Sequence, residues 1–315
     1  MTSRTKIVIG TRGSDLALWQ SNWVAGELHR LHPALSIETK TIKTTGDKIL
    51  DSPLSKIGDK GLFTKEIEKA LLENTIDLAV HSLKDLPTHV TDGLTIGAIT
   101  EREDVRDVFI SHPTKKHASL GAVPKRGTIA TGSLRRKCQL LNHRPDFTIV
   151  DIRGNLKTRR AKLEESDWDG MLLAKAGVTR LGWGEIISEI IPPTLILPAV
   201  GQGALAIEIR SDDAFMASVV SLLEHGITRQ ATTGERSLLR YLEGGCQIPI
   251  GTYGRIESNK FILDAIVGSI DGKRIVRGSI NGNPADSENI GEALAKKLLA
   301  DGAGAILEEI RTMGN

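Results

Sequence analysis

The sequence predicts an α/β protein with two α/β lobes followed by a smaller α+β domain. Short apolar segments typical of strands alternate with helix-forming segments from residue 6 to about residue 180. From Gly251 onward the residues alternate as in antiparallel strands, and two helical segments follow. The length of 315 residues allows two or three domains.

The composition indicates a globular protein, with 40% hydrophobic and 25% charged residues. The two cysteines, Cys138 and Cys246, argue against a disulfide framework and fit a reducing compartment. No CxxC pair or histidine-rich cluster predicts a metal site. No leader segment is recognisable, and no apolar run approaches the roughly 18 residues that span a bilayer. We therefore expect a cytoplasmic protein without a bound metal.

The net charge of +2 hides an uneven distribution. Between Arg102 and Arg160 there are 14 Lys and Arg residues against 5 Asp and Glu residues, a net charge of +9, so the rest of the chain carries −7. A concentrated basic segment points to an anionic partner. For any single charge, an ordinary solvated surface is the simpler explanation.

The first lobe begins with an expected strand over residues 6–10 and a helix over 15–31, joined by Thr11-Arg12-Gly13-Ser14. A strand that enters a helix through glycine and serine is a favoured anion site, because free N–H groups and the helix dipole face the ligand. Arg12 would add a guanidinium, although an ordinary helix cap explains the same residues. Further strands are expected over 35–43, 77–81 and 94–100, and a helix capped by Thr64 runs to residue 72.

A long polar loop before that helix contains Lys56, Lys60 and Phe63. Loops of this length inside a compact domain are often lids or binding loops. After the strand that ends at His81, Lys84 and Asp85 stand where an α/β sheet usually presents ligand-binding groups. A turn or cap carboxylate is the alternative for Asp85.

The second lobe is expected to contain strands over 107–111, 127–131, 147–152 and 168–174. Basic residues follow three of these strands: Arg135 and Arg136 after Ser133, then Arg153, Arg159 and Arg160, and finally Lys175 and Arg180. Arginine in the first turn of a helix opposes the helix dipole. Arg135 and Arg136 therefore favour an anionic ligand that offsets the repulsion.

After the second lobe, a strand over 204–209 comes late enough to be a candidate for crossing back to the first lobe. Helices over 212–225 and 227–242 then lead to the loop Gly244-Gly245-Cys246-Gln247-Ile248-Pro249-Ile250. Its glycines free the backbone and its proline fixes it again, so the thiol can be presented to a cavity. A lone cysteine of this kind is more often an inert buried residue. Strands over 252–257, 261–268 and 274–280 and helices over 287–299 and 303–311 form the third domain.

Many arginines at strand ends suit a ligand with several carboxylates, because the planar guanidinium pairs with a carboxylate through two hydrogen bonds. Nucleic acid is the competing polyanion. The aromatic content of 3% leaves few stacking platforms, and the basic residues stand at pocket positions instead of along one helix face. Both observations weigh against nucleic acid.

Eight stretches that span most of the chain occur in one characteristic order. They are Gly10-Thr11-Arg12-Gly13-Ser14, Thr44-Thr45-Gly46-Asp47, Lys60-Gly61-Leu62-Phe63-Thr64-Lys65-Glu66, His81-Ser82-Leu83-Lys84-Asp85-Leu86-Pro87-Thr88, Ser133-Leu134-Arg135-Arg136, Arg153-Gly154-Asn155, Pro198-Ala199-Val200-Gly201-Gln202-Gly203 and the loop around Cys246. Together they resemble the porphobilinogen deaminase family, also called hydroxymethylbilane synthases. Leu83, Leu86 and Ala130-Thr131-Gly132-Ser133 depart slightly from the family's usual motifs.

The resemblance implies a transferase of porphyrin and haem biosynthesis that deaminates four porphobilinogen molecules and joins them head to tail into the linear tetrapyrrole hydroxymethylbilane, releasing ammonia. It implies that Cys246 holds a dipyrromethane cofactor through a thioether and that Asp85 is the catalytic carboxylate. The implied cofactor- and substrate-binding residues are Arg12, Ser14, Lys84, Ser133, Arg135, Arg136, Arg153, Arg159 and Arg180. The implied loop and cleft residues are Lys56, Lys60, Phe63 and Gln202.

The resemblance also implies the architecture. The two lobes would be like those of periplasmic binding proteins, each with a mixed five-stranded sheet, and the C-terminal α+β domain would carry a three-stranded antiparallel sheet. The implied domains are 1–103 with 201–222, 104–200 and 226–315. We expect a monomer without nucleic-acid or membrane partners.

Two other functions stay open from the residues. A non-catalytic, two-lobed anion-binding protein would explain the arginines but not Cys246 or Asp85. A Cys/His hydrolase that pairs Cys246 with His81 would need a nucleophile elbow, which the sequence lacks, and His81 is expected inside a strand. We expect the other cysteine, Cys138, to be structural.

Overall fold

The computed structural model describes residues 4–48, 61–242 and 248–313, and these fall into two compact units. The first unit takes in the described residues up to Glu103 together with Gly203–Arg229. The second takes in Asp104–Gln202 and the described residues from Gln230 onward. The division into three domains, 1–103 with 201–222, 104–200 and 226–315, stays a prediction.

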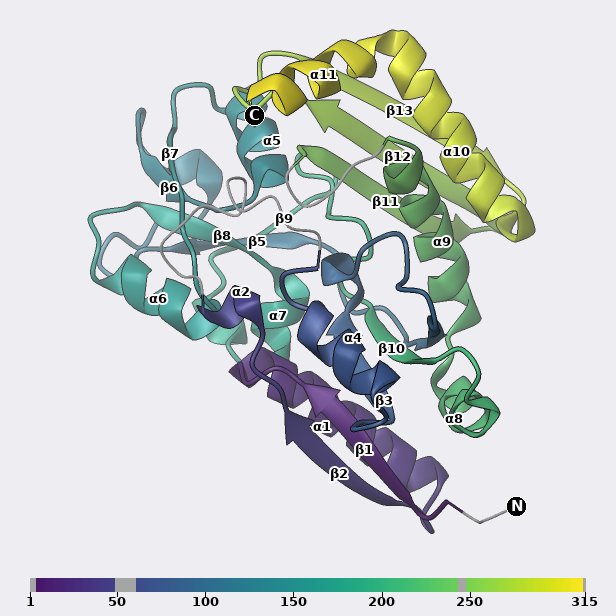
Figure 1. The fold of residues 1–315 in the computed structure, drawn as a ribbon. Helices are drawn as coiled ribbons and strands as arrows, with labels where there is room; N and C mark the ends of the chain where they lie inside the picture. The colour runs from purple at the N-terminus through teal and green to yellow at the C-terminus, as the bar shows by residue number, and fades with distance from the viewer. Residues whose placement is uncertain (1–3, 49–60, 243–247, 314–315) are drawn as a thin grey trace. The chain divides into compact units, whose positions relative to one another are not determined.

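Five strands of the first unit form a mixed sheet in the order β2-β1-β3-β10-β4 (Figure 1). They are β1 (Lys6–Thr11), β2 (Ser36–Thr41), β3 (Leu78–Ser82), β4 (Leu94–Ile99) and β10 (Leu205–Arg210). Strand β1 pairs in parallel with β2 and β3, whereas β10 runs antiparallel to β3 and β4. The late strand therefore does return to the first sheet.

Helices cover both faces of this first sheet. On one face, α1 (Asp15–Leu31) and α8 (Ala214–Val220) pack on apolar residues of β1, β3 and β10, with Ile9 and Leu78 fully buried. On the other face, Ile67 and Leu71 of α4 (Lys65–Leu72) pack against Ala79 of β3. Alternate residues of each strand thus feed two separate cores, as expected for a sheet covered on both sides.

The second sheet has the order β7-β6-β8-β5-β9. Its strands are β5 (Asp107–Ser111), β6 (Thr128–Ala130), β7 (Thr148–Val150), β8 (Gly170–Ala174) and β9 (Glu189–Ile191). Strand β6 is parallel to β7 and β8, and β5 is antiparallel to β8 and β9. Its two cores include residues of α5 (Leu134–His143), α6 (Leu156–Glu164) and α7 (Lys175–Arg180).

A third sheet is antiparallel, in the order β11 (Ile250–Glu257), β12 (Lys260–Gly268) and β13 (Ile275–Gly282). It packs with α9 (Gly226–Tyr241), α10 (Ser287–Leu298) and α11 (Gly304–Met313) around the fully buried Phe261. A π-helical turn over Leu299–Ala303 joins the last two helices, and Gly302, with φ of 105°, breaks the helical path there. The predicted fold class, two mixed five-stranded sheets and a three-stranded antiparallel sheet, is confirmed.

Several local predictions were wrong. The segment Thr45–Lys48, predicted as loop, forms the short helix α2, and β9 was not predicted. The single helix expected over 212–225 is divided, because α8 ends at Val220 and a 3-10 turn, η4 (Ser221–Leu223), follows. The other 3-10 turns are η1 (Leu83–Asp85), η2 (Leu120–Ala122), η3 (Gly184–Ile186) and η5 (Pro284–Asp286). Across the described ranges, none of the helices is both long and apolar enough to cross a membrane.

Candidate active site

The junction between β1 and α1 places Arg12 and Ser14 at the wall of a small cavity. The Ala17 N–H donates to Ser14 Oγ at 3.3 Å, so this serine is the N-cap of α1. Arg12 precedes the cap, and its guanidinium carbon lies 4.2 Å from the ring centre of Phe63, a cation–π contact. The arginine is thus oriented by an aromatic ring at the cavity wall.

Asp85 lies on the 3-10 turn η1, directly after β3. Leu83 and Leu86, on either side of it, are 1% and 8% exposed and anchor the turn in a core cluster. The Leu83 N–H also donates to the Ala204 carbonyl of the loop before β10 at 3.0 Å. An exposed carboxylate is therefore held on a firmly packed turn, with the half-buried Lys84 beside it.

Four of the predicted site residues, Arg12, Ser14, Phe63 and Asp85, line this one cavity. Other residues that line it, among them Gln20, Thr64 and Ser82, were not among the predicted site residues. The Gln20 side-chain amide donates to Ser82 Oγ at 2.9 Å, which ties α1 to the end of β3. The cavity has a volume of about 60 Å³.

His81 also lines the cavity, and its Nε2 lies 3.0 Å from Glu208 Oε2 on β10. Both side chains are almost fully buried, at 5% and 2% exposed. A buried carboxylate from another strand therefore engages one ring nitrogen of His81. Sequence reasoning missed this pair because the partners are 127 residues apart.

In the second unit, Arg135 and Arg136 of α5 both turn inward to Asp107, the first residue of β5. Arg135 Nη1 donates to Asp107 Oδ2 at 2.7 Å, and Arg136 Nη2 donates to Oδ1 at 2.8 Å. Gln202 Nε2 also donates to Oδ1, at 2.9 Å. Asp107 is fully buried and each arginine is 5% exposed. Asp107 carried no sequence signal beyond its place at the start of a strand.

Burial alone would raise the pKa of the Asp107 carboxyl, but the adjacent guanidinium groups outweigh burial and hold the pKa well below its usual range. The expectation that a ligand must offset Arg135 and Arg136 therefore needs correction, because the chain supplies its own carboxylate. One carboxylate faces two guanidinium groups, so this cluster keeps a net positive charge. The Nε atoms of both arginines have no hydrogen-bond partner among the described residues. The cluster thus still suits a further anion.

Comparison with known proteins decides which family combines these features. Residues 7–218 match the family described as porphobilinogen deaminase, dipyromethane cofactor binding domain. Residues 230–300 match porphobilinogen deaminase, C-terminal domain. The chain belongs to the porphobilinogen deaminase family.

Full-length relatives agree with this assignment. The chain is 54% identical over 312 residues to a porphobilinogen deaminase of Chlorobium phaeobacteroides strain BS1, covering 98% of this chain and 99% of the relative. It is 50% identical over 312 residues to one of Carboxydothermus hydrogenoformans, covering 99% of each. Among solved structures it is similar to the periplasmic VFT2 domain of Bordetella pertussis BvgS, with 10% identity, a TM-score of 0.42 and coverage of 75% of this chain and 94% of that one. No functional conclusion follows from so low a similarity.

Three residues that the resemblance to porphobilinogen deaminases singles out, Lys56, Lys60 and Cys246, lie outside the described residues. Among those in the second unit, several lie at helix ends. Ser133 is the N-cap of α5 and accepts the Arg136 N–H, while Arg153 and Arg159 flank the start of α6 and Arg180 ends α7. Arg159 Nε donates to the Gly154 carbonyl at 2.8 Å, and the three arginines are half-buried.

The acidic groups of a dipyrromethane cofactor are compatible with the cluster around Asp107. Its excess positive charge and the unpartnered Nε atoms of Arg135 and Arg136 suit carboxylates, and the residues therefore fit the cofactor of this family. Within the described ranges, no group of three or more His, Cys, Asp or Glu side chains could hold a metal ion. The other cysteine, Cys138, is buried, and burial raises the pKa of its thiol to about 12.

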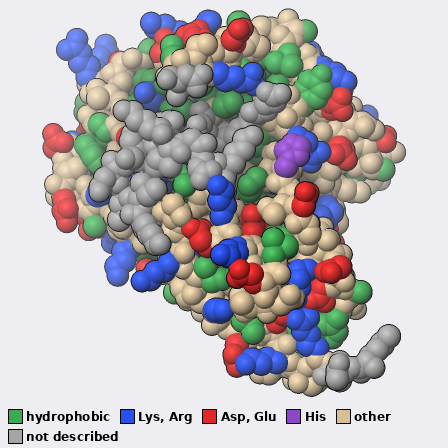
Figure 2. Space-filling view, viewed as in Figure 1, with side chains coloured by type: hydrophobic (Ala, Val, Ile, Leu, Met, Phe, Trp, Pro, Cys, Tyr) green, Lys and Arg blue, Asp and Glu red, His purple; other side chains and the backbone are tan. Residues whose placement is uncertain are grey.

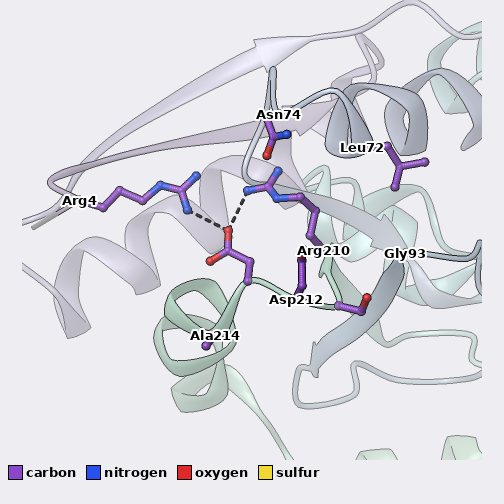
Figure 3. A pocket seen from close by; sticks show the side chains of 9 residues that line it. Arg4, Leu72, Asn74, Gly93, Arg210, Asp212 and Ala214 are labelled. Carbon is purple, nitrogen blue, oxygen red and sulfur yellow. Dashed lines mark hydrogen bonds and ion pairs between the residues drawn. The ribbon is translucent and has the colours of Figure 1, made fainter. Parts of the chain in front are cut away.

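A roomier cavity of about 520 Å³ in the first unit is not a candidate active site (Figure 3). Both of its arginines are paired, since Arg4 and Arg210 each donate to Asp213 at 2.8 Å. Arg210 also donates to the carbonyls of Leu71 and Ile76 at 2.9 and 2.8 Å. These contacts tie β10 to the start of the chain and to the α4–β3 connection, so the cavity wall is structural.

Proposed function

We propose that Asp85 and Cys246 carry the family's reaction in this chain. That reaction deaminates four porphobilinogen molecules and joins them head to tail into hydroxymethylbilane. The observation that supports this assignment is the shared cavity, in which the carboxylate of Asp85 faces the same small space as Arg12. An acidic pyrrole with a leaving amine needs both groups: a cation for its carboxylates and an anion for the positive charge that develops at the ring.

The chemistry explains the position of Asp85 on a rigid turn. The C–N bond of the substrate's aminomethyl group breaks and the nitrogen leaves as ammonia, while the pyrrole ring supplies the electron pair and becomes a methylene-pyrroline cation. Asp85 stabilises this cation and accepts a hydrogen bond from its ring N–H. The methylene carbon then bonds to the unsubstituted carbon of the preceding pyrrole, which loses its proton. After the fourth unit, the bond that joins the methylene carbon of the first unit to the primer pyrrole would break, and a proton would take its place on the primer's ring carbon. Water would then add to the freed methylene carbon and give the hydroxymethyl group.

We assign substrate and cofactor carboxylates to the basic residues that the family motifs share with this chain. In the first unit these are Arg12, Ser14 and Lys84, and in the second Ser133, Arg135, Arg136, Arg153, Arg159 and Arg180. Guanidinium groups bind carboxylates through paired hydrogen bonds. Lys56, Lys60 and Phe63 belong to the loop that we propose covers the site, and Gln202 holds Asp107 through its side-chain amide.

The dipyrromethane cofactor is assigned to Cys246, which would hold it through a thioether. When bound, it supplies the pyrrole to which the first substrate ring is joined. The chain's own part is to hold its carboxylates, for which the Arg135 and Arg136 cluster has the right charge. The high pKa of the Cys138 thiol makes that residue a poor alternative attachment point, because thiolate is the nucleophilic form.

We further propose that the enzyme acts as a cytoplasmic monomer and binds no nucleic acid. On the face drawn in Figure 2, Lys and Arg side chains are interspersed with Asp and Glu side chains, unlike the single-sign surface of a nucleic-acid binder. Size-exclusion chromatography with light scattering tests the monomer. A mass near twice the 34.1 kDa of the chain would contradict it.

Intact-mass spectrometry of the purified protein tests the assignment of Cys246. We expect a mass excess of one dipyrromethane in the wild type and in Cys138→Ala, and no excess and no turnover of porphobilinogen in Cys246→Ser. An unmodified wild type with full turnover would overturn the assignment. A non-catalytic anion-binding protein would bind porphobilinogen without releasing ammonia, and a Cys/His hydrolase would lose activity on His81→Gln without any mass excess in the wild type.

A further inference from the structure

Thr64 lines the same cavity as Asp85, and its hydroxyl is buried there. The residue occupies the N-cap position of α4, as predicted, but no hydrogen bond from its side chain caps the helix. It is 1% exposed, and Oγ1 has no hydrogen-bond partner among the described residues. The prediction that Thr64 caps this helix was therefore wrong at the level of the side chain.

Other helix starts show what such a residue normally does. Ser14 accepts the Ala17 N–H in α1, Ser133 accepts the Arg136 N–H in α5, and Asn155 accepts the Thr158 N–H in α6. A buried hydroxyl without a partner destabilises a protein, and such groups call for an explanation. For Thr64 the position of the side chain, at the wall of the catalytic cavity, supplies one.

Phe63 and Thr64 line the same cavity as Arg12. The centre of the Phe63 ring lies 4.2 Å from the guanidinium carbon of Arg12. We expect the ring to move when a substrate carboxylate pairs with this guanidinium.

We infer that the Thr64 hydroxyl is a substrate-binding group that donates a hydrogen bond to the carboxylate of porphobilinogen held by Arg12. This inference rests on the proposed function. Arg12, Thr64 and Asp85 all line this cavity. The charge of Arg12 and the N-terminus of α4 both favour an anion beside Thr64, whereas the Asp85 carboxylate favours the ring N–H groups. Thr64 thereby fixes which side of the ring faces Arg12.

Steady-state kinetics on two variants test the inference. Thr64→Val keeps the shape and removes the hydroxyl, and we expect KM for porphobilinogen to rise about tenfold, the loss of one hydrogen bond to a charged group. Thr64→Ser keeps the hydroxyl, and its KM should stay within about twofold of wild type. The cofactor mass excess should be unchanged in both, because Thr64 acts on the incoming substrate.

The melting temperature provides a second test, because a substrate-binding role and a structural role of the hydroxyl predict changes in Tm of opposite sign for Thr64→Val. Removing an unsatisfied buried hydroxyl should raise Tm of Thr64→Val by about 2 °C. The matched control is Thr252→Val, since Thr252 Oγ1 on β11 is equally buried and unpartnered but lies in another sheet. It should raise Tm by a similar amount and leave KM unchanged.

The outcomes separate this inference from the proposed function. A wild type that does not consume porphobilinogen refutes the proposed function. An active wild type whose Thr64→Val variant has an unchanged KM overturns the inference alone. A fall in Tm of Thr64→Val, or failure of both Thr64→Val and Thr64→Ala to fold, would mark the hydroxyl as structural and overturn it as well.

Discussion

The two five-stranded sheets share one plan but use arginine in opposite ways. Each places three parallel strands beside an antiparallel strand, in the orders β2-β1-β3-β10-β4 and β7-β6-β8-β5-β9. In each, a serine caps the helix that follows the central parallel strand, Ser14 in the first and Ser133 in the second. Arg12 precedes its cap and lies at a cavity wall, whereas Arg135 and Arg136 follow theirs and turn into the core.

The carboxylates differ in the same way. Asp85 is exposed on a turn, and Asp107 is fully buried between two guanidinium groups that hold its pKa well below the usual range. The Asp107 carboxylate stays ionised near neutral pH and its charge is already paired with two arginines. An exposed carboxylate at a cavity can instead stabilise a cation that forms on a bound substrate. Burial, and not topology, therefore separates the ionic group that maintains structure from the one that we propose acts on substrate.

The largest expected effect comes from breaking the buried cluster. Asp107→Ala leaves two buried guanidinium groups without a counterion, and we expect the second unit to lose about 3–5 kcal/mol of unfolding free energy. Urea denaturation measures this loss of unfolding free energy. The first unfolding transition is the one compared between variants, because a protein with two compact units need not unfold in one step.

The control for that measurement is Glu164→Ala, which removes the exposed partner of Arg160 and should cost no more than about 0.5 kcal/mol. Equal unfolding free energies of Asp107→Ala and Glu164→Ala would contradict a structural role for Asp107, because the buried carboxylate would then contribute no more to stability than an exposed one.

Asp85→Asn should show the reverse pattern. The exposed carboxylate contributes little to stability, so the unfolding free energy should stay within about 0.5 kcal/mol of wild type. Loss of the anion that stabilises the methylene-pyrroline cation should lower kcat by about 100- to 1,000-fold. Single-turnover ammonia release measures the chemical step directly, and full kcat in this variant would remove Asp85 from the mechanism.

Acid should act on the buried cluster. Because the folded-state pKa of Asp107 is depressed, its contribution to stability is complete above the ordinary Asp value of about 4 and is lost as pH falls towards the folded-state pKa. Asp104 and Asp169 also have lowered pKa values, so the informative quantity is the difference from Asp107→Asn. Below pH 4, the denaturant midpoint of the wild type should fall more steeply with decreasing pH than that of Asp107→Asn. Parallel plots of midpoint against pH would contradict a contribution of the ionised Asp107 to stability.

The smallest expected effect concerns the cavity wall. Phe63→Leu removes the cation–π contact with Arg12, worth about 0.5–1 kcal/mol at a partly exposed site, so a substrate carboxylate no longer competes with the ring for the guanidinium. We expect a slightly lower KM for porphobilinogen with stability close to wild type. Phe63→Tyr, which keeps an aromatic face, should retain the wild-type KM, and a KM that rises in Phe63→Leu alone would indicate that the ring contacts substrate.

The sequence by itself determined the local structure and the identity of the chemistry. Ser14, Ser133 and Asn155 each cap a helix through a backbone N–H three residues ahead, so neighbouring sequence is enough to place them. The strands were placed to within a few residues, except for the three-residue β9. The order of short motifs identified the family and with it the candidate residues, because those motifs are contiguous in the chain.

The tertiary structure alone decided how charged and polar groups are paired. Asp107 meets Arg135 from 28 residues away, and His81 meets Glu208 from 127 residues away. These partners lie on different strands and helices, so their contact depends on strand order and register, to which no local pattern is sensitive. Thr64 shows a related limit: its position at the start of α4 was predictable, but the absence of a capping hydrogen bond from its side chain was not. Long-range packing, and not residue type, therefore decides which polar groups are paired within the fold.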